Sequence, residues 1–233
     1  MVVQMPAKSS SPSKPGKKQD TRARISEAYM ATLQREGHAP ASVHRFCEEL
    51  GIREKDFYEA FPNLDAVEKH FWKAWIESII TAVSTGKEWD SFSAKERYLA
   101  FLFAFTGEAL EQRSLLEQRF GKLTLLCRPT SLNGLKNSFK DFAGDLIHHG
   151  MDRGEIANRG ALGNFYPEVL YIHWRSVLEY FLKDDSQGFE RTDAFIEKTV
   201  EFAFDLLRTQ AIDSAADLAR FLLPQLAQFG GRH

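Results

Sequence analysis

Apolar side chains recur along most of the chain after residue 20, at the three- to four-residue spacing of one face of an α-helix. The longest stripe consists of Val67, Phe71, Trp75, Ile79 and Val83. We find no segment with the apolar–polar alternation of a half-buried strand. The pattern therefore predicts an all-α protein.

Glycines, prolines and polar turns divide this helical pattern into segments. We expect a first helix that ends at Gly37, a short helix on each side of Gly51, and a long helix after the Pro62–Asn63 turn. Ser93 and Glu96 form a predicted capping box at the start of the next helix. Further helices are expected to end near Cys127 and to cover roughly residues 131–156, 164–183, 189–210 and 213–229.

The segments group into three regions. Residues 1–19 are rich in Ser, Pro, Gly and Lys and contain no acidic residue, so we expect a disordered basic arm. This arm is either a solvated tail or a source of positive charge beside DNA. Residues 20–62 form a small helical module, and residues 63–233 form a larger helical body.

Composition restricts the class of protein further. Hydrophobic residues make up 43% of the 233 residues, which is enough for a sizeable core. Lys and Arg number 30 against 32 Asp and Glu, so a nucleic-acid surface would have to be local. Two cysteines without a signal peptide, and no apolar run long enough to span a membrane, predict a soluble cytoplasmic protein.

Residues 41–61 have the features of a helix-turn-helix. A small residue, Cys47, occupies the position where the second helix crosses the first, and Gly51 suits the turn. The apolar residues expected to wedge the two helices together are Phe46, Leu50, Ile52 and Phe57. The sequence FYEAFPNLDAVEKHFW then follows from Phe57, placing an aromatic cluster and a turn before the long helix.

With this continuation, residues 22–75 resemble the DNA-binding module of the tetracycline-repressor (TetR) family. That family has a glycine turn, a hydrophobic-Tyr-x-x-Phe signature in its recognition helix and a long connecting helix. The segment FLKDDSQGFERTDAFIEKTVEFAFDLL, which begins at Phe181, resembles the closing helices of the family's ligand-binding and dimerising body. The resemblance implies a ligand-responsive transcriptional regulator, a repressor that binds a palindromic operator as a homodimer.

The resemblance also assigns DNA contacts. Ser42 matches a phosphate-contacting Ser or Thr, Arg45 lies on the same helix, and Tyr58 matches the signature tyrosine whose hydroxyl contacts a phosphate. Charged residues occupy the groove-facing start of the recognition helix. The predicted DNA-binding residues are Ser42, His44, Arg45, Arg53, Lys55, Asp56 and Tyr58.

Two features depart from the family pattern. Leu64 stands where a lysine usually grips the DNA backbone, and the recognition helix carries three acids, Glu54, Asp56 and Glu59. An acid can accept a hydrogen bond from the cytosine amino group, but three acids lower non-specific affinity for a polyanion. The alternative function is therefore a TetR-like fold that has lost DNA binding and binds an apolar ligand or a partner protein.

Two nearly all-apolar segments in the body, FLFAFTGEAL and FYPEVLYIHWRSVLEYFL, are expected to be buried. They are either core and subunit interface or the wall of a ligand cavity, with Phe101, Phe105, Tyr171 and Trp174 as candidate contacts. Because few basic residues accompany them, we expect a small apolar or aromatic effector. The predicted dimer interface comprises Phe195, Thr199, Val200, Phe202 and Leu206.

Nothing in the sequence favours an enzyme. His148 and His149 have no partner at metal-ligand spacing, and no glycine-rich phosphate loop or nucleophile elbow is present. We therefore predict no catalytic residues, no metal and no cofactor. His173, in an apolar helix, is expected to be a hydrogen-bonded core histidine.

Overall fold

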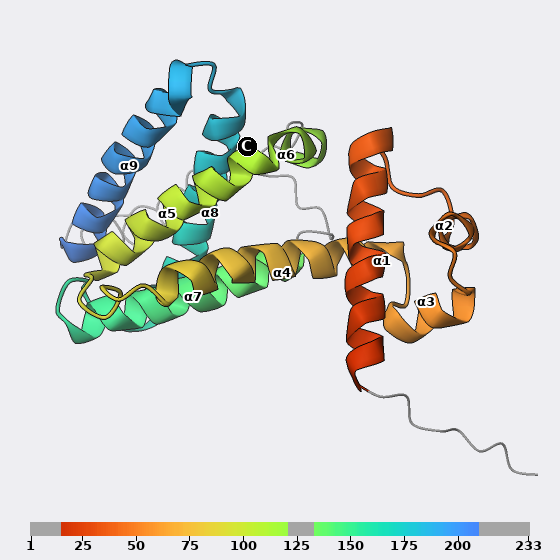
Figure 1. Ribbon diagram of the computed structural model, residues 1–233. Coiled ribbons are helices and arrows are strands. Elements are labelled where there is room, and N and C mark those ends of the chain that lie inside the picture. Colours follow the sequence, from red (N-terminus) through yellow and green to blue (C-terminus); the bar gives the residue numbers. More distant parts are fainter. Residues whose placement is uncertain (1–14, 121–132, 210–233) are drawn as a thin grey trace, which may run out of the picture. The chain divides into compact units, whose positions relative to one another are not determined.

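The computed structural model describes residues 15–120 and 133–209 and contains two compact units (Figure 1). The boundary falls inside the long helix α4 (Leu64–Ser84), between Trp72 and Lys73. Within the described ranges every regular element is a helix, which confirms the all-α prediction. None of the described helices is long and apolar enough to cross a membrane.

The first unit contains α1 (Pro15–Glu36), α2 (Val43–Leu50), α3 (Glu54–Ala60) and the start of α4. As predicted, α1 ends at Gly37, which adopts a φ of 74°. The helix begins earlier than predicted. Residues 15–19 are helical, whereas they were expected to belong to a disordered arm. Proline is well tolerated in the first turn of a helix. The remainder of the predicted arm, residues 1–14, lies outside the described residues.

Aromatic side chains fill the core of this unit. Phe57 lies in edge-to-face contact with Phe46, with ring centroids 6.2 Å apart. The carboxylate of Glu68, only 2% exposed, accepts hydrogen bonds from the Tyr29 hydroxyl and the Trp72 indole N–H, both at 3.1 Å. These bonds fix the start of α4 against α1 and satisfy a polar group whose burial would otherwise be costly.

The second unit contains the rest of α4 and the helices of the body. These are α5 (Ala94–Glu111), α6 (Arg113–Phe120), α7 (Asn133–Asp152), α8 (Tyr166–Lys183) and α9 (Glu190–Arg208), with short 3₁₀ turns at Gly160–Phe165 and Gln187–Phe189. Helix α7 packs along α8, and α5 packs against both α7 and α9. The predicted helix at 213–229 and the approach to Cys127 lie outside the described residues.

The body's core is a stack of aromatic rings. Phe139 of α7 stacks on Trp174 of α8 with centroids 4.8 Å apart and planes 10° from parallel. Phe105 of α5 meets the same indole edge-on at 5.1 Å. Three helices are thus joined through one tryptophan.

A partly buried polar chain joins α5, α8 and α9. The Tyr98 hydroxyl lies 2.8 Å from His173 Nδ1, and His173 Nε2 lies 2.8 Å from the Thr199 hydroxyl. The Thr199 hydroxyl donates in turn to the carbonyl of Phe195 at 2.7 Å. His173 is therefore the hydrogen-bonded core histidine that was predicted, and its burial lowers its pKa to about 4.

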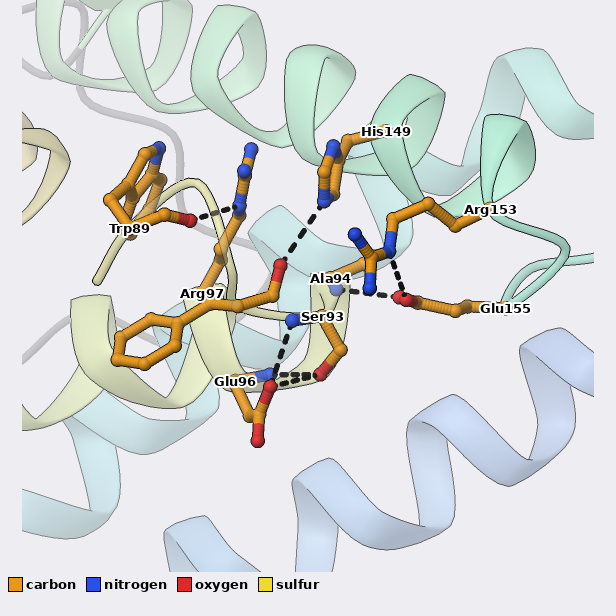
Figure 2. A network of polar contacts seen from close by, with 9 residues as sticks. Trp89, Ser93, Ala94, Glu96, Arg97, His149, Arg153 and Glu155 are labelled. Atoms are coloured by element: carbon orange, nitrogen blue, oxygen red, sulfur yellow. Dashed lines mark hydrogen bonds and ion pairs between the residues drawn. The ribbon is translucent and has the colours of Figure 1, made fainter.

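Figure 2 shows how the start of α5 is fastened to the end of α7. Ser93 and Glu96 form the predicted capping box, and the next backbone N–H, that of Ala94, donates to Glu155 at 2.7 Å. From α7, His149 Nε2 lies 3.1 Å from the carbonyl of Phe92. This fastening positions the first turn of α5, and with it Arg97, beside α7.

Candidate DNA-binding surface and ligand groove

The α2–α3 pair has the local geometry that a helix-turn-helix requires. Ser42 caps α2 by accepting a hydrogen bond from the Arg45 N–H at 3.2 Å. Gly51 ends α2 in the left-handed region, at φ 67° and ψ 37°, and the N–H of Ile52 then bonds the carbonyl of Cys47 at 3.0 Å. Cys47 is buried, as its predicted place at the helix crossing requires.

Two arginines of α1 hold the C-terminal ends of α2 and α3. This role was not predicted from the sequence. Arg24 donates to the carbonyl of Leu50, the last residue of α2, at 2.8 Å. Arg22 donates to the carbonyl of Ala60, the last residue of α3, at 2.8 Å and lies over the Phe61 ring. Cations at helix C-termini satisfy unpaired carbonyls and oppose the helix dipole. The two arginines therefore fix both helices to α1.

The predicted DNA-binding residues lie on the exposed side of this pair, and their cations are matched by acids. Arg45 bonds Glu49 at 3.1 Å, and Lys55 lies 3.8 Å from Glu59. Arg53 grips Asp56 through two hydrogen bonds, of 2.8 and 2.6 Å. Such exposed pairs are individually weak, so the cations can exchange carboxylate for phosphate at small cost.

His44 lies between two acids. Its Nδ1 is 2.7 Å from Glu54 and its Nε2 is 3.6 Å from Glu48. The hydrogen bond to Glu54, helped by the charge of Glu48, raises the pKa of His44 above its ordinary value. Tyr58 is 53% exposed, and its ring stands edge-on against Phe57 at 5.4 Å. A phosphate can therefore reach this exposed side chain.

A groove with a volume of about 480 Å³ opens in the body. Its walls come from one face of α4, one face of α7, the turn at Trp89, and Arg97 of α5. Within each helix the lining residues follow the three- and four-residue steps of a single face. The lining residues are Glu77, Ile80, Thr81, Ser84, Trp89, Arg97, Ser138, Asp141, Phe142, Asp145 and Leu146.

The predicted ligand contacts lie deeper than this groove. Phe101, Phe105, Tyr171 and Trp174 are all buried in the aromatic core. Phe142 connects these aromatic residues to the groove, because it lines the groove and its ring centroid lies 5.0 Å from that of Phe101. The aromatic set therefore forms a layer behind the groove wall. The groove residues were missed because Asp and Ser at helical spacing resemble an ordinary solvated face.

The predicted interface residues divide between surface and core. Phe202 on α9 is 64% exposed, and Phe195, Thr199 and Leu206 are half-buried. Val200 is fully buried within the subunit and so does not contribute to the exposed face. An exposed apolar stripe also lies at the start of the segment 164–183, which was predicted to contribute core or subunit interface. It consists of Phe165, just before α8, and of Val169 and Ile172 on α8.

Comparison with known families and solved structures identifies the family to which this arrangement of helices belongs. The family model described as "Tetracyclin repressor-like, C-terminal domain" matches residues 97–222, more than half of the chain. The chain belongs to the tetracycline-repressor-like family of regulators. No curated protein matches the sequence.

Solved structures share the fold at low sequence identity. RolR in complex with resorcinol is 15% identical, with a TM-score of 0.59 over 86% of this chain and 93% of that chain. The fatty acid degradation regulator FadR from Bacillus halodurans is 11% identical, with a TM-score of 0.58 over 78% and 97%. A TetR-family regulatory protein from Rhodococcus RHA1 is 13% identical, with a TM-score of 0.50 over 80% and 96%. At these identities the likeness establishes the fold.

Among the described residues, no group of His, Cys, Asp or Glu side chains is arranged to hold a metal ion.

Proposed function

We propose that this protein is a ligand-responsive transcriptional repressor that binds a palindromic operator as a homodimer. The observation that carries the proposal is the pair α2–α3, in which a capped helix, a left-handed glycine turn and an exposed second helix are held by arginines of α1. This is the geometry with which a helix-turn-helix presents its second helix to the major groove.

In this proposal the side chains divide by role. The Ser42 hydroxyl, Arg45 and Tyr58 contact phosphates, which set affinity and register. Arg53 and Lys55, at the exposed start of α3, reach base edges. Asp56, now held by Arg53, accepts from a cytosine amino group or orients that arginine.

The proposed homodimer forms through α8 and α9. Phe165, Val169 and Ile172 are spaced by four and three residues and are 65%, 50% and 47% exposed. Phe202 adds a fourth large apolar side chain from α9. A continuous exposed stripe of this kind is uncommon on a monomer, and two such helices from each subunit form a four-helix interface around a twofold axis.

The proposed effector is a small molecule that binds in the groove of the body. RolR, which shares the fold, was solved with the small aromatic molecule resorcinol. The groove volume of about 480 Å³ falls within the range of small-molecule sites.

The paired charges on α2 and α3 support one alternative, a family member that no longer binds DNA and whose groove serves a ligand or partner protein alone. Selection of the purified protein against a random duplex library at low and moderate salt separates the two. The repressor is expected to enrich a palindrome with a shallow salt dependence of binding, since few cations face the phosphates unpaired. Retention of no sequence even at low salt would establish the alternative.

A further inference from the structure

The lining of the groove in the body carries strong charge. Three carboxylates, those of Glu77, Asp141 and Asp145, face a single cation, Arg97. A ligand pocket is usually lined mostly by apolar groups with a few polar ones. The excess of negative charge in this lining therefore restricts which charge a ligand of the groove can carry.

The four charged groups differ in how they are already paired. Arg97 donates to the Trp89 carbonyl at 3.1 Å and its guanidinium lies 4.9 Å from the centre of the Trp89 ring (Figure 2). Glu77 accepts from the Ser138 hydroxyl at 3.0 Å and lies 3.7 Å from Lys73. In contrast, the structure gives Asp141 and Asp145 no hydrogen bond or ion pair with any described residue. Both are exposed and lie one turn apart on α7.

Aromatic and apolar groups surround these two acids. The rings of Trp89 and Phe142 lie 6.3 Å apart and 33° from parallel, and Ile80 and Leu146 add aliphatic surface. Aromatic faces attract cations, and carboxylates attract them more strongly. An anion would instead meet three carboxylates and only one arginine from this lining.

We propose that the groove binds an organic cation, a protonated amine or quaternary ammonium group attached to an aromatic or aliphatic body. Asp141 and Asp145 hold the charge, and Trp89 and Phe142 cover the body of the ligand. This inference rests on the proposed function, in which the groove holds the effector, and adds the charge of that effector. The proposed ligand keeps the aromatic or aliphatic body that was expected from the sequence, and departs from that expectation by carrying a positive charge.

The test uses three small molecules that share a phenyl ring and differ in charge: benzyltrimethylammonium, benzyl alcohol and benzoate. Binding to the full-length protein is followed by Trp fluorescence and by calorimetry. Benzyltrimethylammonium is expected to bind best, more weakly as salt rises, and benzoate worst. Asp141→Asn and Asp145→Asn should each weaken the cation by roughly two- to fivefold, the range of an exposed charge pair, and leave benzyl alcohol unaffected.

Asp152→Asn is the matched control, because it removes an exposed acid from the same helix outside the groove. Thermal unfolding of each variant checks that the fold is kept. Equal binding of all three molecules, or cation binding unchanged in both groove variants, overturns the inference and leaves the proposed function in place. Binding of none of them overturns the inference together with the proposed effector groove. Loss of DNA binding in the library selection contradicts the proposed function alone.

Discussion

Gly150 lies near the end of α7, where that helix meets the first turn of α5. A methyl group placed on it would lie 2.7 Å from Ile156 Cδ1 and 2.9 Å from both Ile156 Cγ1 and the Cβ of Ala94. Carbon atoms in favourable contact are separated by about 3.5–4.0 Å, so each contact is short by more than half an ångström. Ala94 has no side-chain rotation with which to move away, and its N–H is held by Glu155.

Gly150→Ala should therefore destabilise the body. Overpacking costs about 1–3 kcal/mol, and three simultaneous contacts favour the upper half of that range. The helix propensity of alanine returns about 1 kcal/mol. The net expectation is a loss of about 1–2 kcal/mol in the free energy of unfolding.

Gly144→Ala provides the control within the same helix. A methyl group at Gly144 meets no atom within 4 Å, so only the propensity gain of up to about 1 kcal/mol should remain. Urea unfolding of both variants, followed by circular dichroism, measures the difference, which should be about 2–3 kcal/mol. If Gly150→Ala is as stable as Gly144→Ala, the close approach of α5 and α7 described above is wrong.

Two further predictions concern DNA binding and assembly. Below its raised pKa, protonated His44 offsets Glu48 and Glu54, and this charge is lost as pH rises through that pKa. Affinity for the selected DNA should thus fall as the pH rises through that pKa, which lies above the ordinary histidine value of 6.5. His44→Asn should remove the dependence in anisotropy titrations, and an unchanged pH profile would exclude this role. Phe202→Asp should convert the dimer to a monomer by light scattering, whereas Phe103→Asp on α5 should not; a monomeric wild type at micromolar concentration would refute the interface.

The sequence predicts the fold well because its signals are local. Gly37 and Gly51 end their helices with positive φ, and Ser93 caps α5 together with Glu96. Helical periodicity, glycine turns and capping residues act within a few positions of each other, so they can be read without tertiary information. The start of α1 is missed by several residues because Pro15 and the following lysines have the composition of a linker and yet are compatible with a first helical turn.

The site is predicted less completely because it depends on long-range contacts. Arg22 and Arg24 reach carbonyls 38 and 26 residues away in sequence, which no local pattern reveals. The groove likewise brings together faces of α4 and α7 whose polar residues look like solvent-facing positions when each helix is considered alone. Conversely, Phe101 and Trp174 were chosen as candidate ligand contacts because they are large aromatic residues in apolar helices, and in the structure they fill the core.

A repressor of this kind requires α3 to read bases. This is tested by comparing the DNA sequences that two variants select with those that the wild type selects. Lys55 lies at the exposed start of α3, whereas Lys73 lies on α4 in the body. Wild type and Lys73→Ala are expected to enrich the same palindrome. Lys55→Ala should change the preferred base at one symmetric position of each half-site. An identical palindrome from Lys55→Ala, or no enriched sequence from the wild type, would show that α3 does not read bases as proposed.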